Sequence, residues 1–382
     1  MLTWGAVAII RAMPYKRIVA KFGTSLLTSG TDHLDLAVVS DLVRQVSELH
    51  RLGKELVVVS SGAVTVGRQK LKGIEERKNT PFKQVLASVG QGQLMHIYEE
   101  LFSQHNITIA QALLTKSDLS DRAGYLNARN TLLALVGLGI ICIVNENDVV
   151  AIDEIEELKF GDNDNLSAMV ANLIDADLLV LLTDTGGLYT ADPRRDSKAT
   201  LIRRVERIDA GIERLAGSSG NIQGIGGMVT KIEAARLATS SGVSVIIASG
   251  RERDVLGRID QGESLGTLFP ARVSRMESRK RWMLSGLASK GRVVVDEGAV
   301  LAMIKHNKSL LPAGVLEVGG DFQRGDIADV LSAGGERIGY GVCNYSSVDI
   351  GVIKGAHSDR ILERLGHEYG DEVIHRNNMV VL

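Results

Sequence analysis

Short runs of consecutive apolar residues alternate with longer stretches of helical periodicity through the first 250 residues. The runs lie at 17–20, 56–59, 107–110, 140–144, 178–182 and 243–247. The helical stretches lie at 36–52, 83–104, 123–138, 163–173 and 228–240. Consecutive apolar positions are typical of strands that are covered on both faces. The alternation therefore predicts an α/β fold, with a mostly parallel sheet sandwiched by helices.

The pattern changes in the last third of the chain. Residues 272–288 are basic and polar without a strong hydrophobic period, which predicts a linker. Short strand-like pieces with glycine turns follow and predict a small, mainly β domain; they lie at 292–295, 314–318, 327–331 and 337–342. The expected organisation is an N-terminal extension (1–15), an α/β domain (16–271), the linker, a mainly β domain (289–372) and a C-terminal tail (373–382).

Composition agrees with two ordinary globular domains and argues against several classes of function. The chain has 382 residues, 45% of them apolar and 24% charged, and its net charge of −2 gives no general attraction to a polyanion. The 8 histidines lack metal-ligand spacing, so we expect no metal site built from protein side chains alone. The two cysteines cannot form a disulfide framework, and Cys142 lies in an apolar run, which favours a reduced, cytoplasmic setting.

The apolar stretch at residues 4–10 is too short to span a bilayer, and no basic segment precedes it. A signal peptide would explain this stretch, but a floppy extension, or a start of translation at Met13, is the plainer explanation. No other segment has the length and hydropathy of a membrane span, so we expect no membrane contact.

Candidate chemistry gathers where the predicted strands end, because ligands of a parallel sheet bind at the carboxyl ends of its strands. Lys21 stands two residues before Gly23, which offers an ammonium group and close backbone approach to an anion. Ser60, Ser61 and Gly62 lead into a helical stretch, whose exposed amide groups suit a carboxylate or phosphate. Taken singly, a surface lysine and an ordinary serine cap would also account for these residues.

Four further segments follow predicted strands or open predicted helices. Residues 145–148 read Asn-Glu-Asn-Asp and residues 161–165 read Gly-Asp-Asn-Asp-Asn; buried acids at this density need cations, amines or phosphate-bound magnesium, although a solvated turn uses the same residues. Thr183 and Asp184 end another strand, and the glycine-rich segment 224–231 opens a helix but is no P-loop. Lysines and backbone amides at one sheet edge indicate phosphoryl transfer, and a carboxylate acceptor would need no catalytic base.

Read together, these segments resemble the amino acid kinase family and, within it, the glutamate 5-kinases of proline biosynthesis. The matching segments occur in family order at 19–25, 59–64, 126–129, 144–149, 161–167, 182–194 and 226–231. They span nearly the whole first domain, which makes the match specific. The resemblance implies that ATP, with Mg²⁺ carried on the nucleotide, phosphorylates the side-chain carboxylate of L-glutamate to γ-glutamyl phosphate.

The resemblance also implies roles for individual residues. Lys21 and Lys231 correspond to catalytic lysines that contact the ATP phosphates, and Asp164 to the carboxylate that orients them. The substrate-binding positions are Ser61, Gly62, Asp148, Asp162 and Asn163, with Asp148 suited to the ammonium group and Ser61 and Asn163 to carboxylate oxygens. The nucleotide-binding positions are Lys21, Gly23, Thr183, Asp184, Ile225, Gly226, Gly227, Met228, Val229, Thr230 and Lys231. Ile225 departs from the family pattern, since many relatives have a hydroxyl residue there.

The C-terminal domain resembles the PUA domain of many bacterial members of this family. The segments that carry the likeness lie at 295–299, 309–314, 320–322, 324–326 and 341–342. Because residues 286–382 hold ten basic and thirteen acidic side chains, we do not expect RNA binding. The resemblance further implies inhibition by proline, sensed in part by Asp148 and Asp162, a dimeric or tetrameric homo-oligomer, and γ-glutamyl phosphate reductase as a transient partner.

Alternative functions stay open at this point. Related kinases of the same fold phosphorylate aspartate or N-acetylglutamate, and others phosphorylate nucleoside monophosphates, which would require more basic residues in the acceptor pocket. An RNA-binding factor with a decayed kinase domain is the alternative from a different class. The intact set of Lys21, Asp148, Asp164 and Lys231 argues against decay, and the acidic C-terminal domain argues against RNA.

Overall fold

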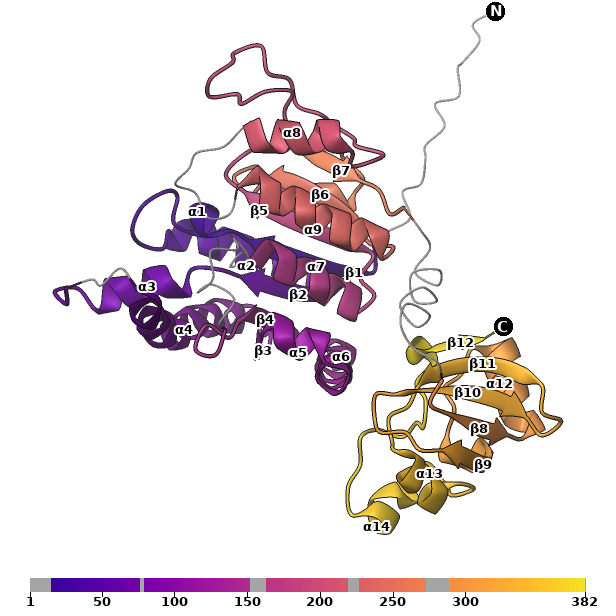
Figure 1. Cartoon of the computed structure of the whole chain (residues 1–382). Helices are drawn as coiled ribbons and strands as arrows, with labels where there is room; N and C mark the ends of the chain where they lie inside the picture. Colours follow the sequence, from indigo (N-terminus) through magenta and orange to yellow (C-terminus); the bar gives the residue numbers. More distant parts are fainter. Residues whose placement is uncertain (1–14, 76–78, 152–162, 219–226, 273–288, 382) are drawn as a thin grey trace, which may run out of the picture. The chain divides into compact units, whose positions relative to one another are not determined.

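The computed structural model describes residues 15–75, 79–151, 163–218, 227–272 and 289–381 (Figure 1). These residues fall into two compact units. The first takes the described residues of 1–117 and 129–272, and the second those of 118–128 and 273–382. Most of the expected N-terminal extension and most of the expected linker lie outside the described residues.

The first unit is built on a seven-stranded sheet of order β3-β4-β2-β1-β5-β6-β7. Its strands are β1 (Arg17–Phe22), β2 (Glu55–Ser60), β3 (Ile109–Leu114), β4 (Ile141–Glu146), β5 (Leu178–Thr183), β6 (Ser244–Ser249) and β7 (Thr267–Phe269). All neighbouring pairs are parallel except β6 with β7. The sheet is therefore mostly parallel, as the alternating pattern predicts, and β7 is an antiparallel edge strand that the pattern did not reveal.

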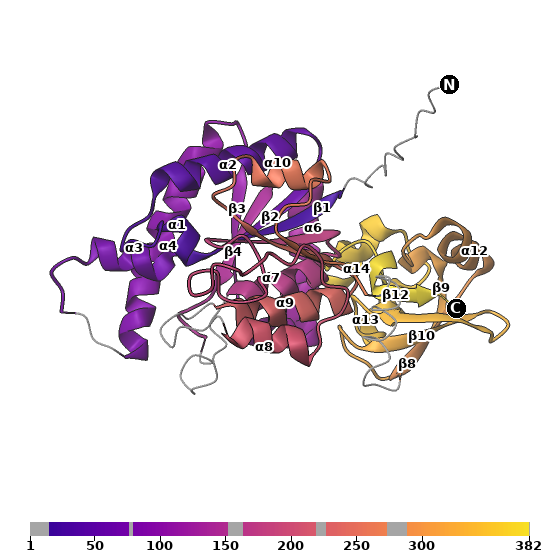
Figure 2. The same cartoon turned by 90° about the horizontal axis from the view of Figure 1, so that it is seen from above.

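Helices connect the strands of this sheet. They are α1 (Thr24–Leu27), α2 (Leu36–Arg51), α3 (Ala63–Lys70), α4 (Thr80–Ser103), α5 (Lys116–Ser120), α6 (Arg122–Gly137), α7 (Asn163–Leu173), α8 (Ala210–Ser218), α9 (Met228–Ser240) and α10 (Val255–Asp260). Figure 2 shows α2 and α10 over one face of the sheet and α7 and α9 over the other. The predicted bounds of α7 and α9 agree with the structure, in which each helix buries several apolar side chains.

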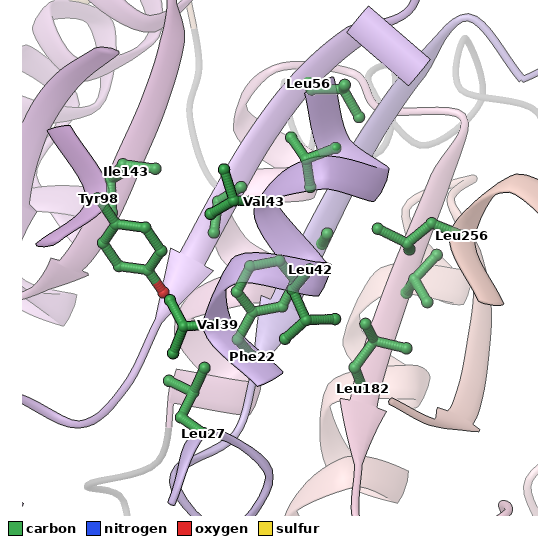
Figure 3. Packing of buried hydrophobic residues seen from close by; sticks show 14 of the residues in the cluster. Phe22, Leu27, Val39, Leu42, Val43, Leu56, Tyr98, Ile143, Leu182 and Leu256 are labelled. Carbon is green, nitrogen blue, oxygen red and sulfur yellow. The ribbon is translucent and has the colours of Figure 1, made fainter. Parts of the chain in front are cut away.

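Alternate residues of the strands point to opposite faces of the sheet. On the α2 and α10 face, Phe22, Leu56, Ile143 and Leu182 join one buried cluster with Tyr98 of α4 (Figure 3). The intervening positions of the same strands are buried on the α7 and α9 face; one of them is Lys21. Full burial on both faces explains why these strands have continuous apolar runs rather than alternating ones.

Close contact between α3 and α4 brings α4 to the end of β2. A Cβ on Gly67 would lie 1.8 Å from the carbonyl oxygen of Leu86, and one on Gly90 would lie 1.8 Å from that of Ala63. Side chains at these two positions would therefore force the helices apart. Since α3 begins two residues after Ser61, this contact brings the middle of α4 to the sheet edge where the strands end.

The second unit contains a five-stranded sheet of order β12-β11-β10-β8-β9. Its strands are β8 (Gly291–Val295), β9 (Val315–Gly320), β10 (Ile327–Ser332), β11 (Arg337–Val342) and β12 (Met379–Val381). Its helices are α12 (Glu297–His306), α13 (Ser347–Ile353) and α14 (Ile361–Leu365), with short 3-10 turns at η1 (Pro312–Gly314), η2 (Ser358–Arg360) and η3 (Arg376–Asn378). The sheet is mixed, since only β8 and β10 pair in parallel.

The segment expected as a C-terminal tail contributes to this second sheet. β12 pairs with β11 in antiparallel fashion, and Val373 and Ile374 are buried in the core of the unit. Three residues are too few for a period-two pattern to stand out in the sequence, which is why the strand was not predicted.

The two cysteines are free and buried, in agreement with the sequence. Burial raises the pKa of the Cys142 thiol to about 12. Among the described helices, none combines the length and hydropathy needed to cross a membrane.

Candidate active site

A buried carboxylate lies between two lysines at the carboxyl edge of the first sheet. Asp164 Oδ1 lies 2.6 Å from Lys21 Nζ, and Asp164 Oδ2 lies 3.1 Å from Lys231 Nζ. The aspartate is fully buried, and the lysines are 3% and 5% exposed. Both ammonium groups thus contact the same carboxylate, at a place where charges are poorly screened. We call these three residues the lysine pair and its aspartate.

The fold explains why three residues so distant in sequence meet here. Lys21 is the last but one residue of β1 and points to the face that α7 covers. Asp164 is in the first turn of α7, and Lys231 is in the first turn of α9. Both helices begin at the carboxyl edge of the sheet, where their free N–H groups and dipoles favour negative charge.

Thr230 joins the lysine pair to the start of α9. Its hydroxyl is within hydrogen-bonding distance of Asp164 Oδ2 at 2.9 Å and of the Gly227 carbonyl oxygen at 2.8 Å. Among the residues that the structure describes, a Cβ on Gly227 would meet no atom within 4 Å, which leaves the backbone here open to an incoming group. The start of α9 thus combines open backbone with an ammonium group, which suits a phosphate.

A second cluster, made of hydroxyl and amide groups, adjoins the aspartate on its N-terminal side. Asn163 Nδ2 lies 2.9 Å from the Ser60 carbonyl oxygen, 2.9 Å from Ser61 Oγ and 3.0 Å from Asn145 Oδ1. These residues come from the ends of β2 and β4 and from the start of α7. Among the described residues, Asn163 Oδ1 is buried without a hydrogen-bond partner. We call this cluster the amide cluster.

Two hydrogen bonds hold the end of β2 in place. Ser60 Oγ and the Tyr98 hydroxyl are 2.7 Å apart, and the Ser61 N–H donates to the Phe22 carbonyl oxygen at 3.2 Å. Burial raises the pKa of Tyr98, so its hydroxyl stays neutral. Gly62 follows with a φ of 105°, a conformation that strongly favours glycine, and precedes the first turn of α3. This turn leaves the Ser61 hydroxyl facing Asn163.

Arg129 fixes the opposite end of α7. Its guanidinium donates to the Leu173 carbonyl oxygen and, at 2.5 Å, to Asp175, and the side chain is 2% exposed. A cation at a helix C-terminus neutralises free carbonyl groups and the helix dipole. Arg129 thereby stabilises the helix whose first turn carries Asn163 and Asp164.

The structure places the other predicted residues at the same sheet edge where it describes them. Gly23 follows β1, its N–H donates to the Leu182 carbonyl oxygen at 3.3 Å, and Thr183 ends β5 with its hydroxyl 3.0 Å from Asp184. Asp148 lies in the turn after β4. Met228 and Val229 lie in the first turn of α9, and Val229 is exposed. Asp162, Ile225 and Gly226 lie outside the described residues.

Sequence reasoning missed some residues that the structure brings to this edge. Asn145 was noted only as part of an acidic segment, yet its side chain links Asn163 to Gln91 of α4. Tyr98 and Gln91 were read as parts of a helix. The signal that could have found Gln91 is the pair of flanking glycines, since Gly90 marks a close approach of α4 to the start of α3.

Carboxylates outside this site do not suggest a metal centre. In the described parts of the chain, no group of three or more His, Cys, Asp or Glu side chains is arranged to hold a metal ion. Both oxygens of Asp164 already face ammonium groups.

Comparison with known proteins shows the family to which the chain belongs. The sequence model of the amino acid kinase family matches residues 16–249, and that of the PUA domain matches residues 291–365. The chain therefore belongs to the amino acid kinase family, with a PUA domain after the kinase domain, and within that family to the glutamate 5-kinases. The expected family and fold class are thereby confirmed.

Relatives that match nearly the whole chain support that assignment. Glutamate 5-kinase of Dehalococcoides mccartyi (strain CBDB1) is 59% identical over 368 residues, which cover 96% of this chain and 99% of the relative. Glutamate 5-kinase of Herpetosiphon aurantiacus is 48% identical over 366 residues, or 96% and 98% of the two chains. Glutamate 5-kinase of Photobacterium profundum is 47% identical over 369 residues, or 97% of each chain.

Proposed function

We propose that the protein is a glutamate 5-kinase, which transfers the γ-phosphoryl group of ATP to the side-chain carboxylate of L-glutamate. The product, γ-glutamyl phosphate, is the first intermediate of proline biosynthesis. The observation that carries the proposal is the contact between two kinds of cluster at one sheet edge. The lysine pair and its aspartate suit a phosphoryl group, and the adjoining amide cluster suits an amino acid.

The lysine pair supplies what phosphoryl transfer requires. Lys21 and Lys231 would neutralise charge on the transferring group, and Asp164 would hold both ammonium groups in position before ATP binds. Gly227 and the following first turn of α9 offer backbone amides to the outer phosphates, and Thr183 and Asp184 would contact the nucleotide. The acceptor carboxylate is ionised at pH 7, so no base is needed to activate it.

The amide cluster suits the acceptor. Asn163 Nδ2 has three acceptors within 3.0 Å but only two hydrogens, whereas Asn163 Oδ1 is left for a donor. Asn163 would therefore accept from the ammonium group of glutamate, rather than donate to a carboxylate as the resemblance suggested. Asp148 and Asp162 would add negative charge for the same ammonium, and Ser61 and the Gly62 amide remain for a carboxylate oxygen.

Magnesium would enter with the nucleotide. The oxygens of Asp164 that could bind a metal face the two lysines and Thr230, at 2.6 to 3.1 Å. Mg²⁺ commonly binds through phosphates with few protein carboxylates, and it would neutralise charge on the β- and γ-phosphates.

Turnover by the purified full-length protein tests the proposed function. With ATP, Mg²⁺ and hydroxylamine, we expect glutamate to give a hydroxamate in step with ADP release, because hydroxylamine traps an acyl phosphate. Aspartate, N-acetylglutamate and UMP serve as competing acceptors, and we expect each to react at least a hundredfold more slowly. Faster turnover with any of these would keep the phosphotransferase class and overturn the acceptor.

Feedback inhibition by proline is the second expected property of this site. Proline carries the same α-carboxylate as glutamate and a secondary ammonium, so it would occupy the positions that Asn163 and Asp148 offer. We expect L-proline to raise the KM for glutamate without lowering kcat. In the Asp148→Asn variant, we expect the half-inhibitory concentration of proline to rise about tenfold, because the acceptor facing the ammonium group of proline loses its negative charge. If proline at about tenfold excess over glutamate leaves the activity unchanged, this proposal is contradicted.

The remaining expectations follow from the family. We propose a cytoplasmic homo-oligomer, a dimer or tetramer, and transient transfer of the unstable product to γ-glutamyl phosphate reductase. RNA binding is not expected, because the PUA domain has more acidic than basic side chains. Sedimentation of the full-length chain would measure the oligomeric state.

A further inference from the structure

The hydrogen bonds of the amide cluster continue one residue beyond the set expected from the sequence. Asn145 Nδ2 donates to Gln91 Oε1 at 2.8 Å. Gln91 is half-buried in the middle of α4, one residue after Gly90, which lies against the backbone of α3. Its Nε2 atom is buried and has no hydrogen-bond partner among the described residues. A buried amide donor without an acceptor is costly, so the atom calls for an explanation.

Two backbone groups fix which atom of each amide faces which way. The Glu146 N–H donates to Asn145 Oδ1 at 2.9 Å, so this atom must be the oxygen and Nδ2 must face Gln91. Gln91 therefore presents its oxygen to Asn145, and its nitrogen is the atom left over. Flipping the Gln91 amide would place two N–H groups against each other. The unused donor follows from the network and not from an arbitrary choice of amide orientation.

The other end of the network is fixed in the same way. Asn163 Nδ2 donates to the Ser60 carbonyl oxygen, so Asn163 Oδ1 must be the oxygen, and it is the second buried polar atom of the network without a described partner. The network thus ends in an unused acceptor at Asn163 and an unused donor at Gln91. The α-carbon of an amino acid carries an ammonium group, which only donates, and a carboxylate, which only accepts. The unused acceptor of Asn163 therefore suits the ammonium group, and the unused donor of Gln91 suits the carboxylate.

We propose that Gln91 binds the α-carboxylate of the amino-acid acceptor through Nε2, an inference that rests on the proposed function. Asn163 adjoins Asp164 in the chain, whereas Gln91 is separated from Asn163 by Asn145. The unused donor therefore belongs to the part of the cluster remote from the lysine pair, where the carboxylate that does not react would lie. Gln91 is a substrate-binding residue that sets affinity and acceptor identity, not a participant in phosphoryl transfer.

The Gln91→Glu variant separates this role from a merely structural one. The side chain introduced by this substitution keeps an oxygen that accepts from Asn145. It replaces the N–H donor of Gln91 with a second, negatively charged oxygen. We expect the KM for L-glutamate to rise about a hundredfold, with kcat within about threefold of wild type and the KM for ATP unchanged. As pH falls toward the pKa of the new carboxyl group, which can donate when protonated, the KM should fall back toward the wild-type value.

The α-amide of glutamate provides a second readout. This compound keeps the reacting carboxylate and the ammonium group, but its α-amide offers N–H donors. We expect the Gln91→Glu variant to shift the preference, as the ratio of kcat/KM values, at least tenfold from glutamate toward the α-amide. If the KM values for both acceptors rise by the same factor, or if neither changes by more than twofold, Gln91 does not bind the α-carboxylate.

Gln93→Glu is the matched control, since it places the same substitution two residues along α4. Gln93 lines a groove with Leu36 and Ile97 and lies outside the amide cluster. We expect its KM for glutamate to equal that of wild type. If Gln91→Glu does not fold, as judged by circular dichroism, Gln91→Met serves in its place with a KM about tenfold above wild type expected, and an unchanged KM overturns the inference. Wild-type protein without glutamate turnover would overturn the proposed function and this inference together, whereas an active wild type with an unaffected variant overturns only the inference.

Discussion

Replacing Lys21 with methionine is expected to lower kcat at least about a thousandfold. Lys21 Nζ is 2.6 Å from Asp164 and 3% exposed, so the substitution removes one of two cations that would face the transferring phosphoryl group in a poorly screened site. Methionine has a similar length and leaves Asp164 with Lys231 and Thr230. The free energy of unfolding should therefore fall by less than in a variant that removes Asp164, which both lysines contact. Steady-state kinetics and urea denaturation measure the two quantities.

Lys54→Met is the matched control for this variant. Lys54 Nζ lies 2.5 Å from Asp260, and 11% of the Lys54 side chain is exposed, against 3% for Lys21. It precedes the first residue of β2, at the amino end of that strand and thus at the opposite edge of the sheet. We expect Lys54→Met to leave kcat within about twofold of wild type. Equal losses of kcat in both variants would mean that Lys21 acts through stability and not in phosphoryl transfer.

Replacing Asp164 with asparagine should have the larger effect on stability. Asp164 is fully buried, and its carboxylate faces two ammonium groups; a neutral amide would remove the negative charge that both lysines contact. Removing one partner from a buried charge network typically costs about 3 kcal/mol or more. Because the lysines would separate, kcat should also fall about a hundredfold or more. Urea denaturation with and without ATP, together with initial rates, tests both expectations.

Asp260→Asn and the Lys21→Met/Asp164→Asn double variant complete this test. Asp260 faces one lysine, Lys54, in a partly exposed pair, so its substitution should cost less stability than that of Asp164. In the double variant, only Lys231 remains as a cation and the repulsion is removed. We therefore expect the double variant to be more stable than Asp164→Asn alone, a non-additivity that a thermodynamic cycle measures. Additive losses would show that like-charge repulsion is not the cause.

Local sequence predicted much of the framework because the signals of a buried parallel sheet are strong. β5 is apolar at five consecutive positions and buried throughout, and a run of that length is typical of a strand that is covered on both faces. α7 and α9 were predicted with their observed bounds. β3 was less well predicted, since the structure extends it to Leu114 with half-buried and exposed residues in alternation. It is an edge strand, and edge strands lack continuous apolar runs.

In the candidate site too, the sequence could identify some residues and not others. Lys21, Ser61, Asn163, Asp164 and Lys231 lie in short segments whose residue types are unusual at strand ends and helix starts, so the sequence could identify them. Gln91 is one of several polar residues in the long helix α4, and its residue type alone gives no signal of that kind. Its place at the site depends on the approach of α4 to α3, in which Gly67 and Gly90 allow backbone contact.

The sequence by itself determined the α/β class, the order of strands and helices, and the family, because these depend on periodicity and on motifs that are local in the chain. Only the tertiary structure decided which side chains touch. Parallel pairing brings the ends of β1, β2, β4 and β5 to one edge of the sheet although they are far apart in the chain. At the opposite edge, the same pairing brings Arg17 to Asp177, 160 residues further along. Charge pairing at Asp164 and the orientation of each amide depend on distances of a few ångströms, which no single segment of sequence encodes.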